Sequence, residues 1–226
     1  LGEKKADRIL IYNPDCVGLW LYQKYTELFA PVILNTEMAL PVATVNPSWT
    51  PVCFGSMYTG VLPEVHGIQG YTKPVITVDS LFDALPRAGK KVALVAVENS
   101  SMAMIFQNRN VDYYLMPYDD SATGKALELI PQDQYDVIVV YNQEYDDMIH
   151  RTSPESEQAM AALNHHIHDF DRLTTAVKHY WSGHDTMVCW ASDHGNHVDW
   201  RGHGTHGEYR PGDINVMHFY GIYPKK

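Results

Sequence analysis

Apolar and polar positions along this chain follow two alternating patterns. Compact apolar runs, which are typical of buried strands, cover residues 8–14, 31–35, 91–97, 111–116, 135–141, 186–191 and 215–222. Apolar residues at helical spacing cover residues 19–29, 51–59, 80–88, 121–130 and 154–180. Helices that alternate with apolar strands predict an α/β fold in which helices flank a mainly parallel sheet.

Two of the predicted helices begin at a hydroxyl residue followed by proline. Proline is tolerated in the first turn of a helix because the N–H groups there have no acceptor within the helix. Thr50-Pro51 therefore predicts the start of a short helix, which Gly60 ends. Ser153-Pro154 predicts the start of the long helix, with Ser153 as its cap.

The composition fits one folded domain that covers residues 1–226. Apolar residues make up 45% of the chain and charged residues 19%, which are ordinary values for a folded protein. The formal net charge of −10 argues against duplex nucleic acid and anionic membrane as partners. A small anionic substrate that is held by metal ions remains compatible with this charge.

Signals for membrane insertion or secretion are not evident in the sequence. No apolar run approaches the ~20 residues of a membrane-spanning helix. The residues before Ile9 lack the apolar core of a signal peptide, although the sequence begins without Met. We therefore expect a cytoplasmic protein. The cysteines Cys16, Cys53 and Cys189 have no metal-type spacing and are expected to be reduced, semi-buried thiols.

Acidic residues and a histidine directly follow two of the apolar runs. Asp15 comes after residues 8–14, and Asp193-His194 comes after residues 186–191. The carboxyl ends of parallel strands share one edge of a sheet, where open α/β folds bind their ligands. For Asp15 alone, a helix cap is the favoured interpretation. Together, however, these positions predict a site at that edge.

Further candidate ligands lie between and after these strands. Asp146 and His150 are four residues apart and would share one side of a helical turn, with Asp147 as the alternative partner. A glycine-rich loop carries His206, with His203 as the alternative. The long helix carries three further histidines: His165, His166 and His168. We expect them to lie on a solvated polar face of the helix, and a second metal site there is the less favoured interpretation.

Converging carboxylates require positive charge, because without it they repel one another and raise their pKa values. Two divalent cations would supply that charge. The mixture of imidazole nitrogen and carboxylate oxygen favours zinc, with manganese or iron as alternatives. The Thr50 hydroxyl either caps its helix or, beside the positive end of the helix dipole, helps to hold an anion such as phosphate.

Five pieces of the chain together resemble the alkaline phosphatase superfamily, and most closely its nucleotide pyrophosphatase/phosphodiesterase-like branch. They occur in the family order between Ile9 and Ile222: a strand followed by Asp15; Thr50-Pro51 with Ser56, Thr59-Gly60, Pro63 and His66-Gly67-Ile68; Asp146 with His150, Ser153-Pro154 and Ser156; Ser192-Asp193-His194-Gly195; and Gly204-Thr205-His206-Gly207. The resemblance implies a three-layer sandwich, here a minimal core without a large cap domain.

The resemblance also implies a metal-dependent hydrolase of phosphate esters, of the phosphodiesterase or nucleotide pyrophosphatase type. Its substrate would be a small phosphate ester or a nucleotide-like molecule, and Thr50 would be the nucleophile. One metal ion would be held by Asp146, His150 and His206. The other would be held by Asp15, Asp193, His194 and the Thr50 hydroxyl.

The chain also departs from the family pattern near the nucleophile. The family usually has Gly where Cys16 stands, and the phosphodiesterase branch often has an Asn shortly after the nucleophile, which is absent here, as is an Arg beside Thr50. No sulfatase-type C/S-x-P-x-R pattern occurs. The backbone N–H groups of Val52 and Cys53 are expected to support a substrate oxygen. The alternatives are a non-catalytic metal- and anion-binding module of the same fold, or a related phosphoryl-transfer or phosphonate-cleaving enzyme.

Overall fold

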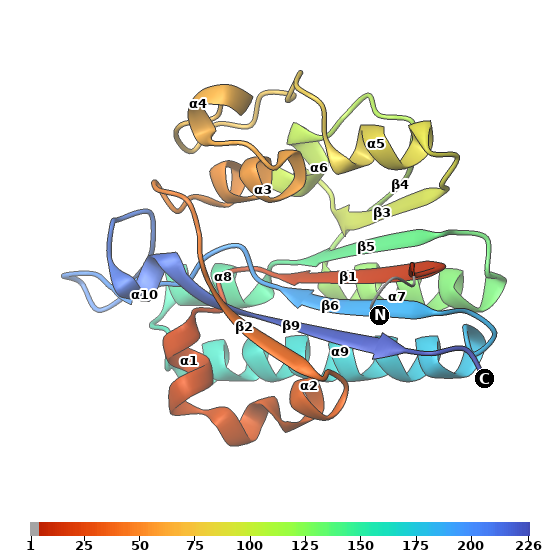
Figure 1. The fold of residues 1–226 in the computed structure, drawn as a ribbon. Coiled ribbons are helices and arrows are strands. Elements are labelled where there is room, and N and C mark those ends of the chain that lie inside the picture. Colours follow the sequence, from red (N-terminus) through yellow and green to blue (C-terminus); the bar gives the residue numbers. More distant parts are fainter. Residues whose placement is uncertain (1–4) are drawn as a thin grey trace.

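A seven-stranded sheet forms the middle layer of the protein in the computed structural model, which describes residues 5–226 (Figure 1). The strand order is β2-β9-β6-β1-β5-β3-β4. The strands are β1 (Arg8–Pro14), β2 (Met38–Ala43), β3 (Val92–Val97), β4 (Asp112–Met116), β5 (Val137–Asn142), β6 (Thr186–Ala191) and β9 (Asn215–Tyr223). In this sheet only β9 runs antiparallel to its neighbours, so the predicted mainly parallel sheet is confirmed.

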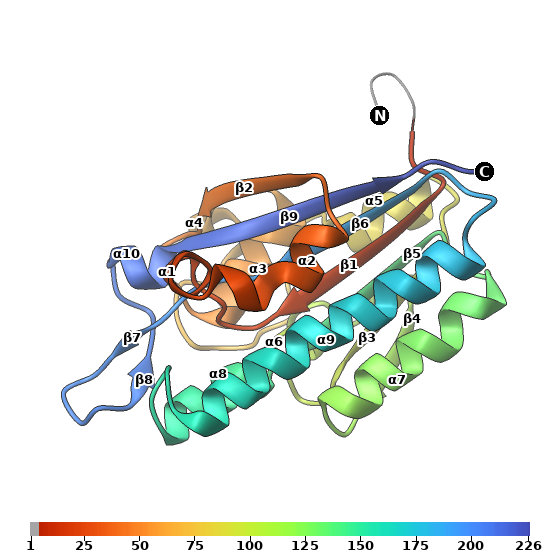
Figure 2. The same ribbon diagram turned by 90° about the horizontal axis from the view of Figure 1, so that it is seen from below.

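Helices cover both faces of the sheet, as the α/β pattern predicts (Figures 1 and 2). One face carries α1 (Leu19–Lys24), α2 (Ala30–Leu34), α7 (Asp119–Leu129), α8 (Glu144–Arg151) and α9 (Glu157–Tyr180). The other carries α3 (Thr50–Thr59), α4 (Pro63–His66), α5 (Leu81–Arg87) and α6 (Ser101–Ile105). Short elements complete the chain: 3-10 turns at Thr26–Phe29 and Ile130–Gln132, strands β7 (His197–Val198) and β8 (Gly204–Thr205), and α10 (Pro211–Ile214).

Two apolar cores lie on opposite faces of the sheet because side chains alternate along each strand. Leu94 and Val139 are register partners in β3 and β5, and both pack into the core beneath α3, α5 and α6. Their successors, Val95 and Val140, pack into the core with α7 and α9. All of these side chains are fully buried. Burial on both faces explains why these strands are continuous apolar runs.

The strand predicted at residues 31–35 is wrong, because Ala30–Leu34 forms α2. Pro31 lies in the first turn of that helix, and only Val32 is buried, whereas Leu34 is 80% exposed. The second strand is β2 instead, at the edge of the sheet, where Pro41 is tolerated because one side of the strand has no neighbour. An apolar run of five residues does not distinguish a single helical turn from a strand.

The long helix begins three residues later than predicted, at Glu157, and Ser156 rather than Ser153 is its cap. The Ser156 hydroxyl accepts a hydrogen bond from the Ala159 N–H at 3.1 Å. The predicted solvated histidine face is wrong at one position. His166 is 1% exposed, whereas His165 is exposed and pairs with Glu144.

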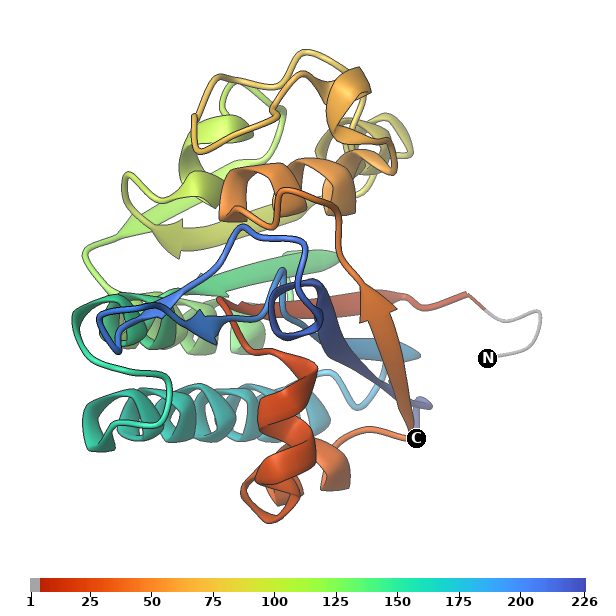
Figure 3. The same cartoon turned by 90° about the vertical axis from the view of Figure 1, so that its left-hand side faces the viewer.

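The carboxyl edge of the sheet gathers three neighbouring strands, β6, β1 and β5 (Figure 3). The start of α8, the start of α3 and the β7–β8 hairpin reach the same edge. These elements carry the residues that sequence reasoning singles out. Within residues 5–226, no helix combines the length and apolar character that crossing a membrane requires.

Candidate metal centre

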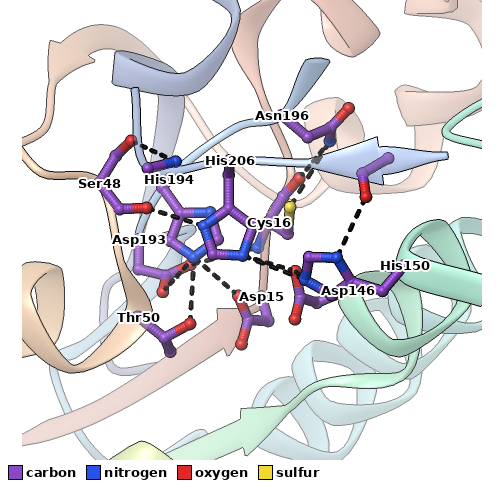
Figure 4. Close-up of polar contacts among 12 residues, drawn as sticks. Asp15, Cys16, Ser48, Thr50, Asp146, His150, Asp193, His194, Asn196 and His206 are labelled. Carbon is purple, nitrogen blue, oxygen red and sulfur yellow. Dashed lines mark hydrogen bonds and ion pairs between the residues drawn. The ribbon is translucent and has the colours of Figure 1, made fainter. Parts of the chain in front are cut away.

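Asp146, His150 and His206 meet at one point of this edge (Figure 4). Asp146 Oδ1 lies 3.3 Å from Nε2 of each histidine, and the two Nε2 atoms are 3.2 Å apart. The predicted helical turn is present, since Asp146 and His150 both lie on α8. Asp147, the alternative partner, instead accepts a hydrogen bond from the Tyr118 hydroxyl at 2.7 Å. These three converging atoms could together hold a cation.

A second group forms around His194, directly after β6. Its Nε2 lies 3.3 Å from Asp15 Oδ1, 3.3 Å from Asp193 Oδ2 and 3.1 Å from Thr50 Oγ1. Asp146 also lies within reach of this group. The chain leaves the strand after Ala191, which lets neighbouring Asp193 and His194 converge rather than point to opposite faces.

Each of the three histidines is oriented by its other ring nitrogen. The Nδ1 atoms of His150, His194 and His206 lie 3.1, 3.0 and 2.9 Å from the backbone carbonyl oxygens of Gly204, Gly195 and Ser48. A proton on Nδ1 can donate to the carbonyl, which leaves the Nε2 lone pair free for a cation. This anchoring is the usual arrangement of histidines that bind metal.

Three buried carboxylate oxygens have no hydrogen-bond partner within residues 5–226: Asp15 Oδ1, Asp146 Oδ1 and Asp193 Oδ2. They are the same atoms that approach the histidine Nε2 atoms. Buried polar atoms without a partner are costly, and a bound cation would satisfy all three. The donor set of carboxylate oxygen and imidazole nitrogen therefore fits divalent metal ions.

The pKa values of the carboxyls reflect this crowding. Burial, and then the charges of Asp193 and Asp146, raise the pKa of Asp15 well above its usual value. Burial also raises the pKa of Asp193 to about 7. Burial opposes ionisation of Asp146 as well, but His206 and His150 outweigh it and hold the pKa of this carboxyl well below its usual range. Opposite shifts within one cluster are common at functional sites.

Thr50 occupies the first turn of α3 and is 4% exposed. The predicted helix start is confirmed, and its hydroxyl faces His194 rather than the backbone. The backbone N–H groups of Val52 and Cys53 both donate to the Trp49 carbonyl at 2.9 Å. The expectation that these groups support a substrate oxygen is therefore wrong.

Two glycines explain how the loop after β7 delivers His206. A Cβ at Gly204 would lie 2.5 Å from Ile149 on α8, and one at Gly207 would lie 2.6 Å from the Trp49 ring. Because the loop backbone passes close to Ile149 and Trp49 at these glycines, His206 lies between α8 and the start of α3. Its ring is edge-on to Trp49. His203, the alternative candidate, lies in the hairpin, where its backbone N–H donates to Asp199.

Sequence reasoning missed several residues that support the site. Cys16 adopts a left-handed backbone conformation (φ 68°), which explains why Gly is usual there, and its N–H donates to Asp193 Oδ1 at 3.2 Å. The Tyr141 hydroxyl donates to Asp15 Oδ2. Tyr141 ends an apolar run, and its sequence pattern predicts a core residue. Only its position at the end of a strand could have indicated that it supports the site. All three cysteines are free and buried.

A polar pocket of about 240 Å³ opens beside the second group. Its lining consists of Asp15, Thr50, Tyr71, Lys73, Glu98, Asn99, Ser100, Ser101, Tyr141, Gln143, Asp146 and Asp147. The Thr50 hydroxyl therefore lies between the histidine cluster and a space that a small molecule can enter.

The sheet and its acidic, histidine-rich edge define an α/β protein with the fold of the alkaline phosphatase superfamily. No protein-family model and no curated protein matches the sequence. Among solved structures, murine ectonucleotide pyrophosphatase/phosphodiesterase 5 is similar, with 18% identity and a TM-score of 0.65 over 84% of this chain and 57% of that one.

Two other similar solved structures are a sulfatase and a phosphonate hydrolase. A 2-O GAG sulfatase has 12% identity and a TM-score of 0.67, over 98% of this chain and 66% of that one. Phosphonoacetate hydrolase from Sinorhizobium meliloti, in complex with phosphonoacetate, has 15% identity and a TM-score of 0.62, over 84% and 57%. The chain therefore spans less than two thirds of the length of these neighbours. The resemblance seen in the sequence motifs is confirmed for the fold.

Proposed function

We propose that residues 1–226 form one catalytic domain that hydrolyses phosphate esters, with Thr50 as the nucleophile and two divalent metal ions as cofactors. The first ion would be held by Asp146, His150 and His206. The second would be held by Asp15, Asp193, His194 and Thr50. Zinc fits this donor set best, and manganese or iron are the alternatives.

One observation carries the proposal. The Thr50 hydroxyl lies 3.1 Å from His194 Nε2, beside buried carboxylate oxygens that lack hydrogen-bond partners. A buried threonine that only capped a helix would direct its oxygen to a backbone N–H group. Here the oxygen belongs to the same cluster as Asp15 and Asp193 and borders the polar pocket.

The chemistry follows from this placement. When bound, two divalent ions would favour an ionised threonine oxygen and neutralise charge on the leaving oxygen. The Thr50 oxygen attacks phosphorus, the bond to the leaving oxygen breaks, and the leaving group departs from a phosphorylated Thr50. Water then hydrolyses this intermediate and releases phosphate from a monoester substrate, or a phosphate monoester from a diester substrate. His194, which burial and His206 keep neutral by lowering its pKa, stays available as a ligand throughout.

The neighbours' names support a small substrate. An inactive variant of the murine protein was solved in complex with AMP, and the bacterial enzyme in complex with phosphonoacetate. A pocket of about 240 Å³ accommodates a phosphate ester of modest size. We therefore propose a small phosphate ester or nucleotide-like substrate, of the kind that phosphodiesterases or nucleotide pyrophosphatases cleave.

The test uses purified protein loaded with zinc or manganese, assayed on p-nitrophenyl phosphate and bis(p-nitrophenyl) phosphate. We expect Thr50→Ala to reduce turnover by at least about a thousandfold, because it removes the attacking oxygen. Thr59→Ala is the matched control, since Thr59 lies on the same helix and its hydroxyl bonds to backbone groups of Gly55 and Val61, away from the candidate site. The control should retain activity.

Other results would redirect the assignment. Full activity in Thr50→Ala would refute the nucleophile. Metal binding without activity on either ester would favour the non-catalytic metal- and anion-binding module. Release of phosphate from phosphonoacetate, but not from the esters, would favour a phosphonate-cleaving enzyme.

A further inference from the structure

Lys73 is the one basic residue in the lining of the pocket beside Thr50, within residues 5–226. It lies in the segment between α4 and α5 and is partly buried. Its ammonium group donates to the Asn99 carbonyl at 2.9 Å and lies 5.7 Å from the centre of the Tyr71 ring. These contacts hold the side chain at the pocket wall.

The position of Lys73 is not explained by an ion pair. Among the ion pairs of residues 5–226, none includes Lys73, although lysines elsewhere, such as Lys24 and Lys90, pair with carboxylates. The Asn99 carbonyl uses one of its three N–H donors, so two remain for a ligand. Burial lowers the pKa of Lys73, and only the charge of Asp15, across the pocket, opposes that shift.

Among the donors that line the pocket, which include Tyr71, Asn99 and Ser101, Lys73 alone carries a positive charge. The N–H groups of Val52 and Cys53 already donate to Trp49, and neither an Asn nor an Arg adjoins Thr50 in the sequence. Two bound metal ions would compensate part of the negative charge of a phosphoryl group. A phosphoryl group with a second negative charge would gain further from a cationic donor on the pocket wall.

We propose that Lys73 binds a non-bridging phosphoryl oxygen and selects substrates whose phosphoryl group carries two negative charges, that is, phosphate monoesters. This inference rests on the proposed phosphate-ester hydrolysis at Thr50, and it changes the preferred substrate from a diester to a monoester. A diester carries one negative charge and places an uncharged ester oxygen where the monoester has an anionic one. Lysine would bind the monoester more strongly, since hydrogen bonds between charged groups are stronger than those to neutral oxygen.

The acidic residues of the pocket do not cancel this charge. Asp147 accepts hydrogen bonds from Tyr118 at 2.7 Å and from Gln143 at 3.3 Å, and Glu98 is exposed to solvent. Both lie in the pocket lining without an ion pair to Lys73. The ammonium group is therefore free to serve an anion that enters the pocket.

The first experiment measures binding of inorganic phosphate to zinc-loaded protein by calorimetry. We expect Lys73→Gln to weaken binding about tenfold, and Lys73→Arg, which keeps the charge, to stay within about threefold. Lys90→Gln is the matched control, because Lys90 lies before β3, at the opposite end of the sheet, and should leave binding unchanged. Thermal unfolding of each variant verifies that the fold is intact.

The second experiment measures kcat/KM for p-nitrophenyl phosphate and for bis(p-nitrophenyl) phosphate. In Lys73→Gln we expect the ratio of monoester to diester activity to fall about tenfold, and in Lys73→Arg to be largely restored. An unchanged ratio, or phosphate binding by Lys73→Gln within twofold of the parent protein, would overturn the proposal. Absence of phosphate binding by the parent protein would overturn it as well.

The two proposals fail in different ways. If the parent protein hydrolyses neither ester but its phosphate binding depends on Lys73, the hydrolase assignment fails and the anion subsite stands. If both esters are hydrolysed and Lys73→Gln behaves like Lys90→Gln in both experiments, the hydrolase assignment stands and the subsite fails.

Discussion

The two ends of the sheet differ in the groups that pair with their carboxylates. At the amino end, Arg8 pairs with Asp133 at 3.0 Å and with Asp136 at 3.1 Å, and Lys90 also reaches Asp136 at 3.4 Å. At the carboxyl end, within residues 5–226, the ion-pair partners of three buried carboxylates are imidazoles and not lysine or arginine: Asp15, Asp146 and Asp193. The chain supplies its own cations at one end, whereas at the other end the proposed metal ions would supply the positive charge.

The pKa values show the same contrast. Although burial opposes it, hydrogen bonds from His184 and Arg8 hold the pKa of Asp133 below its usual value. Burial and neighbouring carboxylates raise the pKa of Asp15. Ion pairs such as those of Asp133 stabilise a fold modestly. Clustered carboxylates without a lysine or arginine destabilise it unless a ligand compensates, which is how binding sites differ from structural ion pairs.

The largest expected effect comes from Asp146→Asn, because Asp146 contributes to both groups of ligands. The amide keeps the shape of the side chain but loses its charge. We expect metal content to fall from about two ions per chain to fewer than one, and ester hydrolysis to fall by at least about a hundredfold. Elemental analysis after desalting and the two ester assays measure these changes.

Asp136→Asn is the control for this variant at the other end of the sheet. Asp136 pairs with Arg8 and Lys90, so its loss should leave metal content and turnover unchanged. If Asp146→Asn kept both ions, or if Asp136→Asn lost them, the distinction between the two ends would not hold.

A smaller effect is expected from the pH dependence of the metal-free protein. The pKa of Asp193 is about 7 in the fold and about 3.9 in an unfolded chain. Between these values only the folded state holds the proton, so stability falls as pH rises. From pH 5 to 8, chelated parent protein should lose about 1–3 kcal/mol relative to chelated Asp193→Asn.

Urea unfolding of both proteins at each pH provides this measurement. Comparison with Asp193→Asn cancels most of the contribution of buried histidines such as His194, whose lowered pKa gives the opposite slope. Zinc-loaded parent protein should lack the loss, because bound cations stabilise the ionised carboxylates. Equal stability changes in the two chelated proteins would contradict the raised pKa of Asp193.

Much of this contrast was predictable from local sequence. Residues 135–141 and 186–191 read as buried strands because both faces of each strand are covered, and an acidic group at such a strand's end belongs to the edge where parallel strands finish. The spacing of Asp146 and His150 sufficed to place both on one side of α8. These features depend on neighbours within a few residues.

The features that sequence reasoning missed depend on distant partners. His166 is buried because the Tyr12 hydroxyl lies 3.0 Å from its ring and the Tyr145 N–H donates to it, and neither contact is visible in the helical pattern. The Tyr141 hydroxyl, on β5, donates a hydrogen bond to Asp15, which follows the neighbouring strand β1. The occupied N–H groups after Thr50 follow from the helix geometry at Trp49, which a proline signal alone does not specify.

The smallest expected effect comes from Arg8→Met at the amino end. The variant keeps much of the side-chain volume and removes the charge. Asp133 then keeps only its ion pair with His184, and Asp136 only its ion pair with Lys90. We expect a loss of about 1 kcal/mol in the free energy of unfolding, measured by urea denaturation, with metal content and ester hydrolysis unchanged. A loss of metal in Arg8→Met would mean that the two ends are coupled through β1, and the amino end would then be part of the functional site rather than a structural counterpart to it.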